Sequence, residues 1–372
     1  MKRTFLVPLF LIVLLLFSSC FRGGLGDKLE NVQDSVVTTA RLLSMQRVEG
    51  YTVVTVNNPW QGGVLHRYVL VPRDSVLPVD LPEGTVVRTP VEHALVYSSV
   101  HTSLFAELGC LDVVHGVVDS QYFIDSTLVA GIQAGKIADC GNSMNPTVEK
   151  VIAMQPDAIL LSPYQDASYG QIVKLDIPII ECADYLEYDP LGRAEWVKFY
   201  GELLGVRERA DSLYDAVVTA YNELKQKAAG AATRPTVVTE MVISGVWSVP
   251  GGQSYMARIM HDAGGDYLWA DNENTGSLSL DFNQVLAVAH DADYWFIKWT
   301  NINTLKDLQG IYDLNKEMAA FQNKRVYVCD TDKTRFFDRI PFHPEVLLRE
   351  FAAILHPELF PDFTPQMYHH ID

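Results

Sequence analysis

The chain has 372 residues and a formal net charge of −17, from 46 acidic and 29 basic side chains. This charge argues against nucleic acid and against anionic lipid as direct binding partners. The length favours two lobes over a single hydrophobic core. Apart from a cysteine near the N-terminus, the chain contains Cys110, Cys140, Cys182 and Cys329. They lack the spacing of a metal site, and both disulfide pairing and buried free thiols remain open.

The N-terminus is typical of an export signal. Two basic residues precede an almost wholly apolar run, Phe5 to Phe17, which is too short to span a bilayer comfortably. Cys20 follows two small residues and resembles the cysteine of a bacterial lipobox. The resemblance implies lipid attachment at Cys20, and an ordinary signal peptide is the alternative. We therefore predict a signal peptide over 1–19 and a lipid-anchored leader over 20–45.

Short strands and helices alternate in the next part of the chain. Strands are expected over 51–56, 68–71, 86–88 and 93–97. A helix over 98–108, ended by Gly109, and a strand over 113–118 follow. The order of strand, helix and strand predicts parallel pairing through a right-handed crossover.

One helix–strand unit occurs twice. The stretch at 145–162 reads NPTVEKVIAMQPDAILLS, and the stretch at 279–295 reads SLDFNQVLAVAHDADYW. Each predicts a short amphipathic helix, a turn with an aspartate and an apolar strand. An alignment without gaps pairs Glu149 with Asn283. The repeat favours two similar α/β lobes with a ligand between them, although helix–strand units in general share this pattern.

A long helix separates the two halves. One helix is expected over 194–204, and a longer one over 207–229 keeps apolar residues at helical spacing. Further strands are expected at 236–242, 294–298 and 325–328, and further helices at 255–263, near Leu305 and at 344–355. The predicted fold class is α/β, with two Rossmann-like lobes joined by one long α-helix and a ligand cleft between them. The expected bounds are 46–190 for the N-terminal lobe, 191–234 for the linker helices and 235–372 for the C-terminal lobe.

Two segments resemble the N-terminal lobe of the helical-backbone (class III) substrate-binding proteins of ABC importers. They are RTPVEHALVYSSVHTSLFAELGCLDVVHGVVDSQY and IADCGNSMNPTVEKVIAMQPDAILLSP, and the likeness continues through PGGQSYMARIMHDAGG and VLLREFAAILHPELFP. The resemblance implies capture of a metal chelate and its delivery to an ABC permease and its ATPase. A ferric siderophore is the first expectation, followed by cobalamin and haem. Little lobe movement is expected, because a single stiff helix joins the lobes.

The ligand is expected in a cleft at the carboxyl ends of the strands. Aromatic candidates for stacking on a large flat chelate are Tyr122, Tyr164, Trp247 and Trp299. Arg335 and Arg339 are candidates for bidentate contacts with its carboxylates or oxyanions. His101 lies in a predicted cleft loop and is a further candidate. The structural alternatives are core packing for the aromatic residues and solvated loop positions for the arginines.

No cluster of His, Cys, Asp or Glu has the spacing of a dedicated metal site. A metal is therefore expected only inside an organic chelator, as an iron or cobalt complex, and no cofactor is expected apart from the attached lipid. His93 and His115 lie too close to predicted core strands to be assigned as ligands.

The resemblance also implies a docking site for the permease. In the family, one glutamate on each lobe meets arginines of the permease. Glu149 matches the first position, Asn283 stands at the second, and Asp281 is a candidate substitute there. The protein is expected to be a monomer in the periplasm, held by its lipid on the inner membrane or on the inner leaflet of the outer membrane.

Two other classes of function are considered. An enzyme is disfavoured because the sequence has no G-x-S-x-G motif, phosphate-binding loop or paired acid–base motif. A permease-independent binding or sensory lipoprotein of the same fold remains open, because Asn283 departs from the docking pattern.

Overall fold

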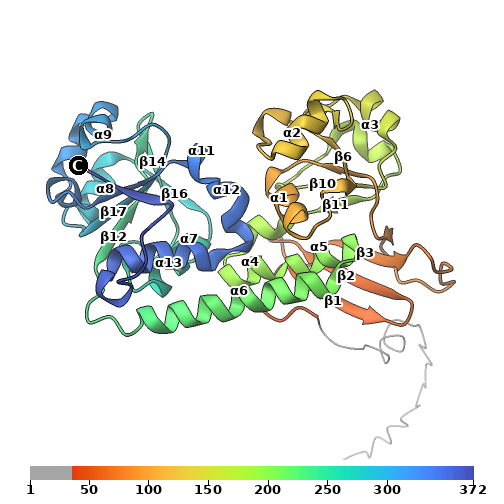
Figure 1. Ribbon diagram of the computed structural model, residues 1–372, viewed down its shortest axis with the longest axis horizontal. Helices are drawn as coiled ribbons and strands as arrows, with labels where there is room; N and C mark the ends of the chain where they lie inside the picture. The colour runs from red at the N-terminus through yellow and green to blue at the C-terminus, as the bar shows by residue number, and fades with distance from the viewer. Residues whose placement is uncertain (1–35) are drawn as a thin grey trace, which may run out of the picture.

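The computed structural model describes residues 36–372, so the predicted signal peptide and Cys20 lie outside the described residues. Two α/β lobes lie above one long helix, α6 (Arg207–Ala228), and form the two ends of an elongated molecule (Figure 1). This arrangement confirms the predicted fold class. Within residues 36–372, no helix has both the length and the apolar character needed to cross a bilayer.

The N-terminal lobe contains a parallel five-stranded sheet of order β11-β10-β5-β6-β7. Its strands are β5 (Ala94–Val96), β6 (Val114–Val117), β7 (Ala138–Asp139), β10 (Ala158–Leu161) and β11 (Ile179–Glu181). Its helices are α1 (Ser99–Glu107), α2 (Ser126–Gln133) and α3 (Val148–Met154), and a small hairpin pairs β8 (Gly141–Asn142) with β9 (Asn145–Pro146). Leu95 and Val96 of β5 belong to two different apolar clusters. Both faces of this sheet are therefore covered, as parallel sheets require.

The C-terminal lobe contains a second five-stranded sheet, of order β15-β12-β17-β18-β19. Its strands are β12 (Thr236–Thr239), β15 (Asp266–Tyr267), β17 (Tyr294–Lys298), β18 (Val326–Cys329) and β19 (Tyr368–Ile371). Only β19 runs antiparallel to its neighbour. The sequence did not predict this strand at the end of the chain. Its exposed polar residues, His369 and His370, concealed it.

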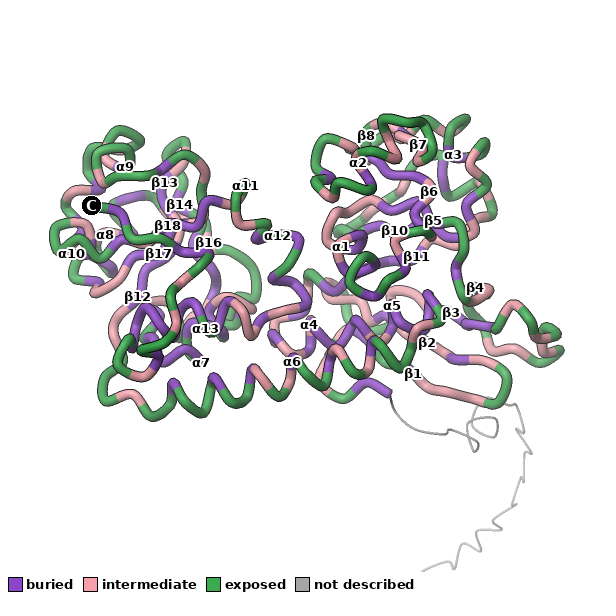
Figure 2. Tube along the Cα trace, in the orientation of Figure 1, coloured by how far each residue is buried: buried purple, intermediate pink, exposed green. Residues whose placement is uncertain are grey.

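Other elements of this lobe surround the second sheet. An antiparallel three-stranded sheet contains β13 (Val242–Ile243), β14 (Val246–Pro250) and β16 (Ser277–Leu280). The helices are α7 (Tyr255–Asp262), α8 (Phe282–Ala289), α9 (Leu305–Ile311), α10 (Ala319–Gln322), α11 (Thr331–Thr334), α12 (Phe336–Arg339) and α13 (Pro344–Leu355). The central strands of both lobes are mostly buried, and exposed residues predominate in the loops (Figure 2).

The two copies of the repeated unit agree in the helix but differ in the length of the turn that follows it. Helix α3 starts at 148 and β10 at 158, ten positions later, whereas α8 starts at 282 and β17 at 294, twelve positions later. The gap-free alignment pairs Asp157 with Asp291, but Asp293 is the aspartate that immediately precedes β17. Asp157 accepts a hydrogen bond from the backbone N–H of His93, and Asp293 accepts one from that of Thr236. Asp293 is therefore the structural equivalent of Asp157.

A four-stranded sheet precedes the N-terminal lobe, with β1 (Leu43–Val48), β2 (Tyr51–Asn57), β3 (Val64–Pro72) and β4 (Thr85–Thr89) in sequential order. Strand β1 begins inside the stretch that was expected to be a leader. The sheet packs against the linker helices α4 (Pro190–Glu195) and α5 (Val197–Leu204), for example through the rings of Tyr68 and Phe199. Gly205 ends α5 in a left-handed conformation, with φ at 70°.

The segment before β1 is held by a buried carboxylate of α4. Glu195 is fully buried and accepts hydrogen bonds from the backbone N–H groups of Thr38 (3.0 Å), Thr39 (2.7 Å) and Ala40 (2.9 Å). A buried carboxylate is tolerated when several donors surround it. This contact fixes the start of the described chain to the linker rather than to either lobe.

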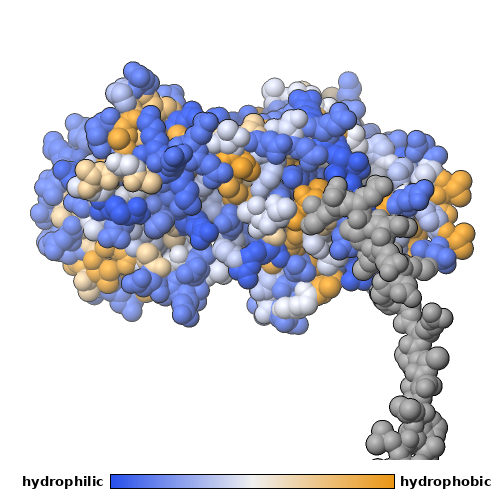
Figure 3. Space-filling model, turned by 90° about the horizontal axis from the view of Figure 1, so that it is seen from below, coloured by the Kyte–Doolittle hydropathy of each residue, from blue (hydrophilic) through white to orange (hydrophobic). Residues whose placement is uncertain are grey.

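The four cysteines within residues 36–372 are buried and unpaired, which settles the question that the sequence left open. The face that carries α6 is largely hydrophilic, with separate hydrophobic areas (Figure 3).

Candidate ligand-binding site between the lobes

The two lobes contact each other through α1 and α12. The Ser98 side chain caps α1 by accepting a hydrogen bond from the backbone of Val100. The next residue, Ser99, donates from its Oγ to Oδ1 of Asp338 at 2.6 Å. Ser99 follows β5 and Asp338 follows β18, so the carboxyl ends of the two parallel sheets face each other. Ligands of open α/β sheets bind at this edge.

A pocket of about 420 Å³ lies at this contact and is called the interlobe pocket below. Residues of both lobes line it. They are Ser103, Leu104, Ala106, Glu107 and Asp125 from the N-terminal lobe, and Thr334, Arg335, Asp338, Arg339, Phe342 and His343 from the C-terminal lobe. The volume lies in the range of small-molecule sites.

The structure brings the two predicted arginines, Arg335 and Arg339, together in this pocket. The Nε of Arg335 lies 3.7 Å from a carboxylate oxygen of Asp338. In the part of the chain that the structure describes, the guanidinium of Arg339 has no carboxylate partner. Both side chains are exposed, so their donors are accessible to an anionic group of a ligand.

Arg335 also shapes the backbone. It separates α11 from α12 and adopts a left-handed conformation, with φ at 55°. The resulting turn buries Phe336, whereas Phe337 is 59% exposed. Phe337 was not among the predicted site residues, although two adjacent phenylalanines on a four-residue helix cannot both point into the core.

His343 connects the lobes on one side of the pocket. Its Nε2 lies 2.8 Å from Oε2 of Glu107, and its Nδ1 lies 3.0 Å from Oε1 of Glu345. Burial lowers the pKa of His343, but the hydrogen bonds to Glu107 and Glu345 outweigh burial and raise it to about 9. At neutral pH the ring is therefore charged, and both nitrogens donate hydrogen bonds to carboxylates.

Three of the four predicted aromatic residues are accessible to a ligand. Tyr122 is 68% exposed, Tyr164 45% and Trp299 42%. They follow the carboxyl ends of β6, β10 and β17, respectively. They therefore lie at the facing carboxyl ends of the two sheets, but none of them is among the residues that line the interlobe pocket.

Trp247 corrects the prediction. It is fully buried in β14, its Nε1 donates to the carbonyl of Thr239 at 2.9 Å, and its ring stacks on Trp295 with centroids 5.4 Å apart. Trp247 is therefore a core residue, which is the alternative that the sequence left open for the aromatic candidates. The sequence pattern concealed this because β14 pairs with β16, which is distant in the chain.

His101 also corrects the prediction. It lies inside α1 and is 2% exposed. Its Nε2 is 3.0 Å from Oδ1 of Asp184 and 3.1 Å from the hydroxyl of Tyr200. Burial lowers its pKa, but the charge interaction with Cys182 and the hydrogen bond to Asp184 raise it to about 10. His101 therefore belongs to a buried polar network and not to the surface of the pocket.

The predicted docking residues lie in the first turns of equivalent helices. Glu149 is exposed on α3, and Asn283 is exposed on α8. Asp281 caps α8, where its Oδ1 accepts a hydrogen bond from the backbone N–H of Gln284 at 2.9 Å. One Asp281 oxygen is thus already used by the helix.

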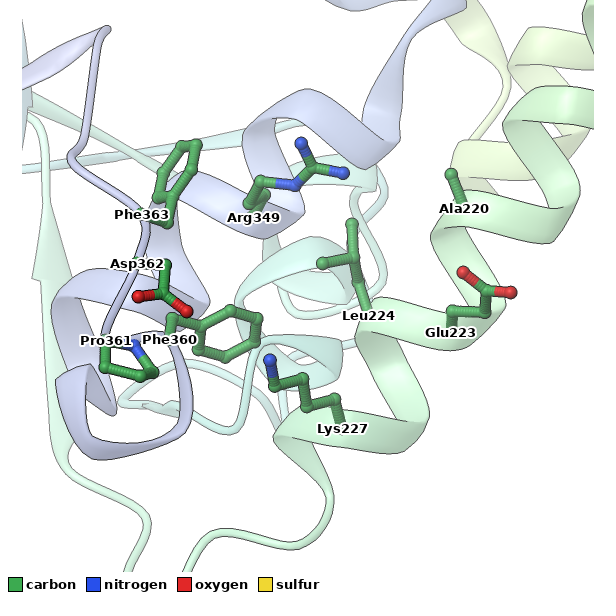
Figure 4. Close-up of a pocket in the computed structure, with 9 residues that line it drawn as sticks. All are labelled: Ala220, Glu223, Leu224, Lys227, Arg349, Phe360, Pro361, Asp362 and Phe363. Atoms are coloured by element: carbon green, nitrogen blue, oxygen red, sulfur yellow. The ribbon is translucent and has the colours of Figure 1, made fainter.

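A second pocket, of about 360 Å³, lies between α6, α13 and the segment that follows α13 (Figure 4). The Nζ of Lys227 lies 4.5 Å from the ring centroid of Phe360, and the Cζ of Arg349 lies 5.7 Å from that of Phe363. Residues of the N-terminal lobe do not line this pocket. It therefore lacks the two-sided character of the interlobe pocket.

Among residues 36–372, no group of three or more His, Cys, Asp or Glu side chains is arranged to hold a metal ion. The two arginines of the interlobe pocket donate hydrogen bonds and cannot coordinate a metal, so they are suited to the acceptor oxygens of an organic ligand.

The model of the periplasmic binding protein family matches residues 96–333. An uncharacterized lipoprotein of Methanocaldococcus jannaschii is 28% identical over 290 residues, which cover 74% of this chain and 67% of that protein. A second uncharacterized lipoprotein of the same organism is 24% identical over 330 residues, covering 84% and 80%.

Solved structures show the same fold. A possible iron-binding periplasmic solute-binding protein from Staphylococcus epidermidis matches with a TM-score of 0.57 at 15% identity, covering 72% of this chain and 100% of that one. A periplasmic heme binding protein from Pseudomonas aeruginosa matches with 0.56 at 16% identity, covering 76% and 98%. A periplasmic vitamin B12 binding protein of Vibrio cholerae matches with 0.54 at 15% identity, covering 72% and 97%.

The family match begins at the last residue of β5, so the sheet β1–β4 lies before it. Because the match covers more than half of the chain and the fold agrees with it, the chain belongs to the periplasmic binding protein family, whose members bind substrates and do not transform them.

Proposed function

We propose that this protein captures a metal chelate between its two lobes and delivers it to an ABC permease. A ferric siderophore is the first candidate, and cobalamin and haem follow. The observation that carries the proposal is the interlobe pocket, which both lobes line and in which Arg335 and Arg339 lie together.

The two arginines favour a ligand with carboxylates or other oxyanions. The chain as a whole has a net charge of −17, which repels anions. An anionic ligand therefore needs local cations, and guanidinium groups bind carboxylates in a bidentate geometry. The exposed rings of Tyr122, Trp299 and Phe337 lie outside the lining of this pocket, and they would supply apolar surface for the part of a large ligand that extends beyond it.

The structurally similar proteins support a metal chelate as the ligand, but they do not identify which chelate it is. The names of three structurally similar proteins refer to iron, heme and vitamin B12. Cobalamin fits the exposed aromatic residues, whereas an anionic ferric siderophore also uses the arginines.

Cys20 and the names of the relatives support a lipid-anchored protein. The anchor would hold the protein in the periplasm, on the inner membrane or on the inner leaflet of the outer membrane. Glu149, and Asn283 or Asp281, would meet the permease on either side of the cleft.

A thermal-shift screen of the purified protein against ferric siderophores, haem, cobalamin and free metal ions tests this function. A ligand at 100 times its Kd stabilises the folded state by about 2.7 kcal/mol, so a true ligand raises the melting temperature clearly. We expect one chelate to do so, by binding in the interlobe pocket, whereas free iron ions should have no effect on the melting temperature. If no chelate raises the melting temperature, the proposal is wrong.

A second candidate is a binding or sensory lipoprotein that works without a permease. Asn283 favours it, because this side chain cannot form the salt bridge that a glutamate would form at the second docking position. Reconstitution with the permease separates the two candidates, since only the importer stimulates ATP hydrolysis.

A further inference from the structure

Two histidines stack at the end of the N-terminal sheet that lies opposite the interlobe pocket. His93 directly precedes β5, and His115 is the second residue of β6. Their ring centroids are 4.2 Å apart, and the ring planes are tilted by 43°. His93 is exposed and His115 is half-buried, so a solute can reach the pair.

A β-bulge places His115 beside His93. Ala94 of β5 pairs with Val114 of β6, but the next residue, Leu95, pairs with Gly116. His115 is therefore an extra residue without a partner in the ladder. Bulges redirect side chains and are frequent beside functional sites.

The backbone of His93 is held in place on both sides by one residue. The backbone N–H of Asp157 donates to the carbonyl of His93 at 2.9 Å, and the Asp157 carboxylate accepts from the N–H of His93 at 3.1 Å. Arg73 in turn contacts this carboxylate. His93 is therefore held in a fixed backbone position, which is what a metal ligand needs.

The hydrogen bonds leave at least one nitrogen of each ring available. The Nδ1 of His115 lies 3.1 Å from the carbonyl of Val113. A carbonyl only accepts, so Nδ1 carries the proton and Nε2 keeps its lone pair. A histidine that binds a metal is oriented in this way, by donating its other N–H to a carbonyl or carboxylate. In the described part of the chain, the ring of His93 makes no hydrogen bond or ion pair.

We propose that His93 and His115 together bind one divalent late transition metal ion, with water in the remaining coordination positions. Two imidazoles bound at right angles to one ion, with metal–nitrogen distances of about 2.0–2.1 Å, have ring centroids about 4.5 Å apart. The observed 4.2 Å is close to this value. Imidazole pairs bind Cu²⁺ more tightly than Ni²⁺ or Zn²⁺, so Cu²⁺ is the most sensitive probe.

The charges around the pair favour a cation. Glu92 and Asp112 are exposed and close to the two histidines in sequence. The positive charge of Arg73 is offset by Asp157 and by Glu92, whose Oε1 lies 3.8 Å from Nε of Arg73. The bound ion would connect β5 to β6 at the sheet edge remote from the cleft, so this site is independent of chelate capture.

Titration of the full-length protein with Cu²⁺ tests the site, by calorimetry and by electron paramagnetic resonance. We expect one ion with two nitrogen ligands in the wild type. His93→Ala and His115→Ala should each weaken binding by at least about tenfold. His290→Ala is the matched control and should change nothing. His290 is an exposed histidine, and among residues 36–372 the one polar partner of its ring is the adjacent Asp291.

Two results would overturn the proposal. One is wild-type binding in both His93→Ala and His115→Ala. The other is an equal, partial loss in all three variants, which would indicate dispersed surface binding. Circular dichroism without metal checks that each variant is folded. If an alanine variant is not folded, His93→Asn or His115→Asn replaces it, because asparagine keeps a polar group in a smaller side chain while the imidazole is lost.

Discussion

Trp247 and Trp299 have opposite surroundings, although the sequence predicts that both stack on a ligand in the cleft. Trp247 is fully buried against Trp295, whereas Trp299 is 42% exposed at the edge that faces the other lobe. Local sequence could not distinguish them, because the burial of Trp247 depends on pairing with the distant strand β16. The same limit applied to His101, whose partners Asp184 and Tyr200 lie on distant elements.

Trp247→Ala should lower the free energy of unfolding by about 3–5 kcal/mol, because it empties a core site. Trp299→Ala should change it by less than about 1 kcal/mol. Urea denaturation measures both values. Equal losses for the two variants would show that the assignment of Trp247 to the core and of Trp299 to the surface is wrong.

The charge of His343 makes the contact between the lobes dependent on pH. Its pKa in the folded protein is about 9, above the ordinary histidine value of about 6.5. A raised pKa stabilises the folded state fully below about pH 6.5, and this contribution disappears as the pH rises through about 9. The difference in unfolding free energy between wild type and His343→Gln should therefore shrink between pH 6 and pH 10. A difference that does not depend on pH would contradict this role.

At the scale of elements, local signals predicted several helices and strands closely and missed others. The predicted parallel pairing of β5 with β6 is confirmed, whereas the single helix expected at 194–204 is two helices, α4 and α5. The final helix was expected at 344–355 and is found there, because a proline fixes its start. Strand β17 also matches its expected bounds, 294–298. The alignment of the two repeated units without gaps misplaced the second turn by two residues, because the length of a turn leaves no periodic pattern in the sequence. Strand β19 was missed because its two central residues, His369 and His370, are adjacent, polar and both exposed, so the strand has no apolar–polar alternation.

The attachment of the N-terminal segment to α4 depends on Glu195. Glu195→Ala leaves the backbone N–H groups of Thr38, Thr39 and Ala40 without their acceptor. The expected loss in unfolding free energy is at least about 3 kcal/mol by urea denaturation. Glu195→Gln keeps one acceptor oxygen and should lose less. If Glu195→Ala left the free energy of unfolding unchanged, water would have replaced the carboxylate as the acceptor, and this role of Glu195 would be contradicted.

At the scale of the whole molecule, the sequence predicted two lobes, a linking helix and both pocket arginines. It could not predict the contacts that join the lobes. Ser99 and Asp338 are separated by 239 positions, and Glu107 and His343 by 236. No local pattern connects residues so far apart, and only the folded chain brings them together.

The exposed position of Glu149 on α3 makes it a test of permease docking. Glu149→Gln should reduce permease-stimulated ATP hydrolysis by about twofold to fivefold, because a rim salt bridge contributes up to about 1 kcal/mol. The effect should fade as salt rises, and ligand affinity should not change. Loss of ligand affinity in this variant would show that Glu149 acts in the cleft instead.

The central claim is that an anionic chelate binds between the lobes, and one titration tests it most directly. The chelate that stabilises the protein most is titrated, with tryptophan fluorescence as the signal, into the wild type and two double variants. Arg335→Gln with Arg339→Gln removes the cations of the interlobe pocket, and Lys227→Gln with Arg349→Gln removes those of the pocket beside α6. We predict an affinity loss of at least about tenfold in the first double variant, since each hydrogen bond to a charged group contributes about 1.5–3 kcal/mol, and wild-type affinity in the second. Wild-type affinity in the first double variant, or a loss confined to the second, would contradict capture between the lobes.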